Sequence, residues 1–339
     1  MNLEELNDIA LAMVAPGKGI LAADESTGTI KKRFDSIGVE STEELRRAYR
    51  EMLFTAPGME QYISGVIMYD ETIRQSAADG TPFPQLLQKL GVVPGIKVDT
   101  GAKDLALCPG EKITEGLDGL RERLAEYYEL GARFAKWRAV ITIGEDIPSN
   151  TCIETNAHAL ARYAALCQEA NIVPIVEPEV LMDADNTIEE CYEVTAHTLK
   201  TVFDELYKQN VALEGIVLKP NMVIAGKKCP TQAEPEQVAE MTVACLTNHV
   251  PASVPGIAFL SGGQSDELAT LHLALMNEMG PHPWELTFSY GRALQAAALK
   301  AWGGKKENVE AAQKAFLHRA KCNGAAHDGT YTPDMEKVA

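Results

Sequence analysis

The sequence Gly215-Ile216-Val217-Leu218-Lys219-Pro220-Asn221 decides how the rest of the chain is interpreted. Val217 and Leu218 favour a β-strand, and Pro220 favours an extended conformation at the residue before it. Lys219 is therefore expected at the end of a strand, at the mouth of a pocket. A lysine among apolar residues loses solvation, which favours its neutral amine, and a neutral amine attacks carbonyl groups. Taken alone, the motif fits an exposed lysine at a strand end better, because most lysines are solvated.

Composition narrows the class of protein. The chain has 339 residues, of which 46% are hydrophobic, enough for two domains or one large α/β barrel. The net charge of −17 argues against a nucleic-acid partner, although small phosphorylated substrates need only a few local cations. The acidic start and the lack of a long apolar run predict a cytoplasmic chain with no membrane partner. The seven cysteines and seven histidines lack metal-ligand spacing, so no metal or cofactor is expected.

Eight short apolar or β-branched runs begin about 30 to 45 residues apart, which is the length of a βα unit. They cover residues 20–23, 65–69, 95–98, 134–140, 173–176, 215–218, 256–260 and 286–290. Eight such units close a barrel, so the predicted fold class is α/β, a (β/α)8 TIM barrel with extra terminal helices over 293–302 and 305–322. No composition break marks a second domain. We expect residues 1–339 to form one barrel domain, with 323–339 as a short, loosely ordered tail.

Helix-start signals separate these runs. Ser41 and Glu44 form a capping-box pattern, and Ser265 precedes another amphipathic segment. Pro235 suits the first turn of a helix.

Charged residues gather where the predicted strands end, the position of the active site in such barrels. For any one of them a structural ion pair is the commoner role, but seven strand ends agree. The charged residues there are Asp24, Glu25, Lys97, Asp99, Lys136, Arg138, Glu177, Glu179, Lys219 and Arg292.

Two of these seven strand ends favour an anion. Ser261-Gly262-Gly263 lies between a strand and a capped helix, where main-chain N–H groups can converge on a phosphate. Gly291-Arg292 follows the next strand and adds a permanent cation, as in the phosphate site of many barrels. A glycine turn that merely caps a helix is the alternative.

A lysine beside carboxylates indicates imine chemistry. The neutral Lys219 amine adds to a ketone, an acid such as Glu177 helps the adduct to lose water, and the imine accepts an electron pair when the neighbouring C–C bond breaks. Asp24 can act as the base for the hydroxyl group, and Lys136 can keep Lys219 neutral through like-charge proximity.

The motifs resemble those of class I fructose-1,6-bisphosphate aldolases over essentially the whole chain. The matching segments are 21–28 (LAADESTG), 95–99 (GIKVD), 134–138 (FAKWR), 176–179 (VEPE), 218–222 (LKPNM), 259–264 (FLSGGQ), 287–294 (TFSYGRAL) and 299–305 (LKAWGGK). The resemblance implies a cytoplasmic lyase of glycolysis and gluconeogenesis. Such an enzyme reversibly cleaves fructose 1,6-bisphosphate to dihydroxyacetone phosphate and glyceraldehyde 3-phosphate through a lysine Schiff base. The family uses no metal and is usually homotetrameric, with sugar phosphates as its small-molecule partners.

The resemblance also implies roles for single residues. Lys219 is the Schiff-base lysine, Glu177 is the acid/base with Glu179 and Lys136 beside it, and Asp24 acts at the hydroxyl next to the scissile bond. The residues implied for the dihydroxyacetone phosphate end are Ser261, Gly262, Gly263, Ser289, Gly291 and Arg292. Those implied around the other phosphate are Ser26, Thr29, Arg33, Lys97 and Arg138.

One step stays open. Animal-type members use a C-terminal tyrosine to protonate the enamine carbon, whereas the last tyrosine here is Tyr331. Tyr331, a water or a carboxylate are the alternatives. Preference for the bisphosphate over fructose 1-phosphate is also open, although Lys97 and Arg33 favour the bisphosphate. The alternative functions are another imine-forming barrel lyase, such as a transaldolase-like or deoxysugar-phosphate aldolase, and a non-catalytic scaffold.

Overall fold

Eight parallel strands close into a barrel in the computed structural model, which describes residues 1–337. The strand order around the barrel is β1-β10-β9-β8-β7-β6-β3-β2. The barrel strands are β1 (Gly19–Ala23), β2 (Ile63–Met68), β3 (Val93–Lys97), β6 (Phe134–Ile141), β7 (Val173–Val180), β8 (Val217–Leu218), β9 (Gly256–Phe259) and β10 (Glu285–Tyr290). Outside the barrel, β4 (Ala102–Asp104) and β5 (Lys112–Thr114) form an antiparallel hairpin.

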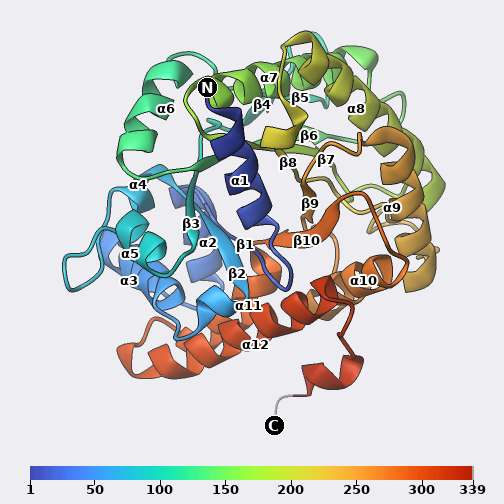
Figure 1. Cartoon of the computed structure of the whole chain (residues 1–339). Helices are drawn as coiled ribbons and strands as arrows, with labels where there is room; N and C mark the ends of the chain where they lie inside the picture. Colours follow the sequence, from blue (N-terminus) through green and yellow to red (C-terminus); the bar gives the residue numbers. More distant parts are fainter. Residues whose placement is uncertain (338–339) are drawn as a thin grey trace.

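Helices surround this barrel (Figure 1). They are α1 (Leu3–Met13), α2 (Thr27–Asp35), α3 (Glu43–Phe54), α4 (Asp70–Ile73), α5 (Phe83–Lys89), α6 (Leu120–Glu129), α7 (Asn150–Glu169), α8 (Ile188–Lys208), α9 (Pro235–His249), α10 (Asp266–Glu278), α11 (Arg292–Trp302) and α12 (Val309–His327). Short 3-10 helices are η1 (Met59–Gln61), η2 (Leu213–Gly215), η3 (Lys306–Asn308) and η4 (Pro333–Glu336). Within residues 1–337, no helix combines the length and the apolar character that crossing a bilayer requires.

One end of the barrel is sealed by apolar side chains. Inside the barrel, a fully buried cluster joins residues of several strands to Leu6, Ala10 and Met13 of α1. Figure 1 shows α1 lying across the barrel end, and its Leu6 contacts Gly215, just before β8. Since α1 covers the end where strands begin, a pocket can open only at the end where they finish.

Phe134 fills part of this interior because its neighbours lack side chains. It is fully buried, and Gly95 lies opposite it in the β3–β6 register. A Cβ atom on Gly95 would lie 2.2 Å from Phe134 Cζ, and one on Gly65 would lie 3.1 Å from Cε1. Glycine at 95 is therefore required by close approach, not by an unusual backbone conformation.

The predicted barrel is confirmed, and each of the eight runs contains or overlaps one barrel strand. The terminal helices also form, as α11 and α12, but α12 extends to His327. Asn323, where the loose tail was expected to begin, is fully buried and accepts a 2.7 Å hydrogen bond from Thr270. Residues 338–339 of the expected tail lie outside the described residues, and the single-domain assignment of 1–339 stays a prediction.

The capping box expected at Ser41 is wrong by one residue. Thr42 is the N-cap of α3, and its Oγ1 accepts a 3.2 Å hydrogen bond from the Leu45 N–H group. Both residues are good caps, but the Ser41 carbonyl oxygen is bound by Arg46 Nη1 at 2.8 Å. The signals at Pro235 and Ser265 are confirmed as the first residue of α9 and the N-cap of α10.

Gly95→Ala should lower the free energy of unfolding by about 1 to 3 kcal/mol, because the added methyl group overpacks the barrel interior against Phe134. Urea unfolding at a fixed protein concentration measures this. Gly28→Ala is the matched control, since a Cβ there meets nothing within 4 Å. Equal stability of the two variants would contradict the packing argument.

Candidate active site

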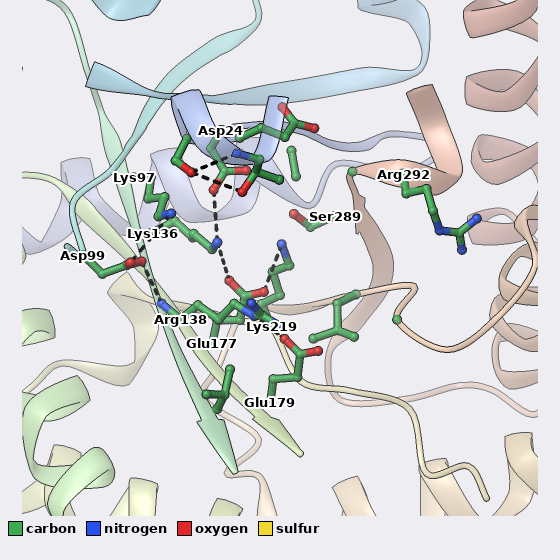
Figure 2. Close-up of a pocket in the computed structure, with 18 of the residues that line it drawn as sticks. Asp24, Lys97, Asp99, Lys136, Arg138, Glu177, Glu179, Lys219, Ser289 and Arg292 are labelled. Carbon is green, nitrogen blue, oxygen red and sulfur yellow. Dashed lines mark hydrogen bonds and ion pairs between the residues drawn. The ribbon is translucent and has the colours of Figure 1, made fainter. Parts of the chain in front are cut away.

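The open end of the barrel holds a cavity of about 330 Å³ (Figure 2). All but one of the residues expected at the site line it. They are Asp24, Ser26, Thr29, Arg33, Lys97, Lys136, Arg138, Glu177, Glu179, Lys219, Ser261, Gly262, Ser289, Gly291 and Arg292. Gly263 is the exception, since it is not among the residues of 1–337 that line the cavity.

Lys219 comes directly after β8 and is held there by the backbone. Its N–H group donates to the Val176 carbonyl oxygen at 2.8 Å, which continues the pairing with β7. The residue is only 3% exposed, and its Nζ lies 3.3 Å from Glu177 Oε1. The exposed-lysine interpretation of this motif is therefore wrong.

Lys136 connects two carboxylates at the centre of the cavity. Its Nζ lies 3.0 Å from Asp24 Oδ2 and 3.1 Å from Glu177 Oε2. Glu177 thus has one oxygen toward Lys136 and the other toward Lys219. Figure 2 shows these four side chains converging, two amino groups alternating with two carboxylates.

Burial opposes the charged forms of Lys219, Glu177 and Lys136, but the net change in pKa differs among them. It lowers the pKa of Lys219; Lys136 lowers it further, while Glu177 acts in the opposite direction. For Glu177, burial raises the pKa, and the two lysines outweigh it, so the net pKa is lowered. Burial opposes the charge of Lys136 too, yet Asp24 and Glu177 raise its pKa. The arrangement keeps Lys136 charged and favours the neutral amine of Lys219, which is the nucleophilic form.

A second set of charges surrounds this centre. Glu179, two residues after Glu177 on β7, pairs with Arg138 on β6. Asp99 accepts a 3.2 Å hydrogen bond from the Arg138 main-chain N–H group and lies 3.8 Å from Lys97 Nζ. Asp99 therefore positions both cations on this side of the cavity.

The glycine turn after β9 has a packing reason. A Cβ on Gly262 would lie 2.6 Å from Met182 Cε, and one on Gly263 would lie 2.3 Å from Met182 Cγ. Gly263 also has a φ of 79°, a conformation that glycine adopts without strain. Gly263 thus shapes the turn against Met182, while Ser261 and Gly262 face the cavity.

Two groups beside this turn can receive an anion. The Oγ atom of Ser289, at the end of β10, is buried without a hydrogen-bond partner among the described residues. Gly291 precedes α11, and its carbonyl oxygen accepts from the N–H groups of Leu294 and Gln295, so the N–H groups of Arg292 and Ala293 remain at the start of the helix. An anion here would satisfy both.

On the opposite side, the first turn of α2 offers hydroxyl groups. Ser26 is the N-cap of α2, and its Oγ lies 3.1 Å from Thr29 Oγ1. Arg33, in the last turn of the same helix, pairs with Glu25. These residues and Lys97 make a second region suited to phosphate.

Glu25 was noted in the sequence, but its partners were missed. Its carboxylate also lies 2.7 Å from Arg50 Nη1 and accepts a 3.0 Å hydrogen bond from Gln295. Gln295 in turn donates to the Ala22 carbonyl oxygen at 2.8 Å, which fixes the end of β1 next to Asp24. Arg50 and Gln295 lie inside helical segments, and only the fold brings them to Glu25.

Tyr331 is placed away from this chemistry. It is buried, donates to Glu336 Oε1 at 3.0 Å, and does not line the cavity within residues 1–337. The same segment contributes Glu336 to a group with His318 and Cys322, whose ligand atoms lie within 4.8 Å of one another and could hold a metal. Glu336 is already paired there with Arg319.

Comparisons with known proteins agree with one another. A family model described as fructose-bisphosphate aldolase class-I matches residues 5–339. A Xanthomonas campestris protein named probable fructose-bisphosphate aldolase class 1 is 62% identical over 98% of this chain and 99% of its own length. Arabidopsis thaliana fructose-bisphosphate aldolase 4, cytosolic, is 56% identical over 95% of this chain and 82% of its own. Fructose-bisphosphate aldolase from Plasmodium falciparum, solved in a ternary co-crystal with TRAP and an inhibitor, superposes with a TM-score of 0.96 at 50% identity, covering 97% of this chain and 96% of that one.

Lys136→Met should destabilise the fold by about 3 to 5 kcal/mol near neutral pH, because Asp24 and Glu177 lose their shared cation while buried. In the wild type both carboxyl groups have lowered pKa values, so their stabilising contribution is present above pH ~4 and lost as the pH falls. In the Lys136→Met variant, burial raises the pKa values of Asp24 and Glu177. The free-energy cost of burying their charges therefore disappears as the two carboxylates become protonated. The stability gap should therefore narrow below pH ~4.

Urea unfolding at several pH values measures this gap. Lys97→Met is the control, because Lys97 is 20% exposed in its side chain and 3.8 Å from its carboxylate. A gap that widens on acidification would contradict the assigned charges.

Proposed function

The chain belongs to the class I fructose-bisphosphate aldolase family, and we propose which of its residues carry out the family's reaction. The enzyme is a metal-independent lyase of glycolysis that reversibly cleaves fructose 1,6-bisphosphate to dihydroxyacetone phosphate and glyceraldehyde 3-phosphate through a lysine Schiff base. The proposal is that Lys219 forms this Schiff base. Its main support is the 3.3 Å approach of Lys219 Nζ to Glu177 Oε1 in a buried site.

Glu177 is proposed as the acid/base of imine formation. When the neutral Lys219 amine attacks the ketone carbon, the nitrogen loses a proton and the former carbonyl oxygen becomes a hydroxyl group. Glu177 can carry that proton from the nitrogen to the oxygen. A second proton, taken up from solvent and delivered by Glu177, then lets the hydroxyl leave as water, and the nitrogen is left as the protonated imine. Because Lys219 reacts as the neutral amine, it carries no charge that would lower the Glu177 pKa at this stage, which makes the protonated form of Glu177 more accessible.

Asp24 is proposed as the base of bond cleavage. It removes the proton from the hydroxyl group next to the scissile bond, the C–C bond breaks, and its electron pair moves to the imine to form an enamine. Lys136, 3.0 Å from Asp24, stabilises the charge that moves between the two carboxylates. Glu179 holds Arg138 beside this centre.

The two phosphates of the substrate are proposed to lie on opposite sides of Lys219. Ser261, Gly262, Ser289, Gly291 and Arg292 would bind the phosphate of the dihydroxyacetone half, with Gly263 shaping the turn. The unpartnered Oγ of Ser289 supports this assignment. The other phosphate would bind at Ser26, Thr29, Arg33, Lys97 and Arg138.

We also propose a homotetramer in the cytoplasm. The assembly rests on the family resemblance. The location is supported by the similar Arabidopsis protein, whose name includes cytosolic.

Borohydride reduction in the presence of dihydroxyacetone phosphate should attach the ketone covalently to Lys219, because reduction converts the imine to a stable amine. Peptide mass spectrometry locates the adduct. Lys219→Met should lose both the adduct and turnover, whereas Lys227→Met, which removes a lysine paired with Asp183 on the surface, should keep both. An adduct on another lysine, or turnover abolished by a chelator, would sink the assignment.

Lys97→Met should raise the KM for fructose 1,6-bisphosphate about tenfold or more, since a hydrogen bond to a charged group contributes about 1.5 to 3 kcal/mol. The KM for fructose 1-phosphate should change little, because that sugar lacks the second phosphate. Initial rates with the two substrates measure the difference. Lys103→Met, an exposed lysine on nearby β4, controls for net charge; equal effects of Lys97→Met on both substrates would contradict the second phosphate site.

A further inference from the structure

Arg292 lines the cavity but its guanidinium is bound elsewhere. Nη1 lies 2.8 Å from Asp266 Oδ1, and Nη2 donates to the Gln264 carbonyl oxygen. Figure 2 shows the side chain directed away from Lys219 and Ser289. In this position Arg292 does not contribute to the anion site that Ser289 and Gly291 form.

Asp266, the first residue of α10, is set between two arginines. Arg319, from α12, donates to the Asp266 main-chain oxygen at 3.0 Å and to Thr270 Oγ1 at 2.6 Å. Arg319 is fixed there, with its side chain 5% exposed and paired with Glu336. The side chain of Arg292 is 50% exposed, so it is the partner that can leave.

The departure of Arg292 would not leave Asp266 without a cation. Burial raises the Asp266 pKa, and both Arg292 and Arg319 oppose that rise. With Arg292 gone, the fixed charge of Arg319, which binds the main-chain oxygen of Asp266, still favours the ionised carboxylate. Arg292 can therefore exchange one carboxylate for a phosphate at little cost to the protein.

A phosphate is the stronger partner for Arg292. It carries close to two negative charges and three acceptor oxygens, against one charge on the carboxylate. The Arg292 side chain is 50% exposed and that of Asp266 is 18% exposed. Pairs with such an exposed partner contribute up to about 1 kcal/mol, which is equivalent to about a fivefold change in binding. The ion pair can hold Arg292 outside the cavity in the free enzyme, and a phosphate can still displace Asp266 from Arg292.

We propose that Asp266 is a positioning residue that holds Arg292 outside the cavity until the phosphate of the dihydroxyacetone half displaces it. This rests on the proposed role of Arg292 in binding that phosphate. Asp266 thereby weakens phosphate binding, because the phosphate must displace it from Arg292.

Asp266→Asn keeps the size of the side chain and removes its charge. Its KM for fructose 1-phosphate, and its dissociation constant for dihydroxyacetone phosphate, should fall about two- to fivefold with no rise in kcat. Asp266→Glu, which retains the charge, should behave as the wild type. Glu267→Gln is the matched control, because it removes the same charge from an exposed neighbour in the same helical turn and should leave both constants unchanged.

The effect must act through Arg292. In an Arg292→Ala background, Asp266→Asn should bring no further tightening. Tightening that persists there, or that Glu267→Gln reproduces, would overturn the proposal in favour of a general charge effect. If Asp266→Asn proves unstable, Asp266→Ser, which also suits a first helical turn, takes its place.

The underlying assignment is tested separately. If Arg292→Ala leaves the dissociation constant for dihydroxyacetone phosphate unchanged, the proposed function of Arg292 fails. If Arg292→Ala weakens binding while neither Asp266 variant tightens it, the positioning role alone is overturned.

Discussion

The ion pairs of Lys136 are the interaction on which the candidate site depends. Two carboxylates, Asp24 and Glu177, are buried at the mouth of the barrel, where either would be costly as an unpaired charge. Lys136 lies within 3.1 Å of both. Its positive charge stabilises the ionised forms of both carboxylates, and the same charge disfavours a second ammonium group at Lys219. One structural cation therefore allows two anions and one neutral nucleophile in a single buried cluster.

Barrel topology makes this cluster possible. Lys136, Glu177 and Lys219 come from or directly follow the consecutive strands β6, β7 and β8, whose register places Arg138 opposite Glu177. Asp24 reaches the group from β1 on the other side of the closed sheet. Because α1 and Phe134 fill the far end with apolar side chains, the charged residues share one enclosed opening and interact strongly with each other.

The sequence was sufficient for the barrel and for most site residues, but not for their orientation. Strand-end position predicted Lys219, Glu177 and Asp24, since parallel strands of a barrel end on the same side. Arg50 and Gln295 were missed because helical residues reveal their partners only when helices are packed. The pairing of Arg292 with Asp266 was equally invisible, because a side chain can turn toward either of two anions. The cap at Thr42 rather than Ser41 depended on a hydrogen bond from Arg46, a contact that the capping pattern does not include.

The most direct test of this account is the pKa of the Lys219 amino group in the free enzyme. NMR of lysines labelled at the ε-carbon, assigned with Lys219→Arg and Lys136→Arg, would measure both buried lysines in one titration. The account predicts that Lys219 titrates below the ordinary lysine value of ~10.4 and Lys136 above it. A Lys219 that titrates at or above the ordinary value would contradict the claim that burial and Lys136 together prepare it as the nucleophile.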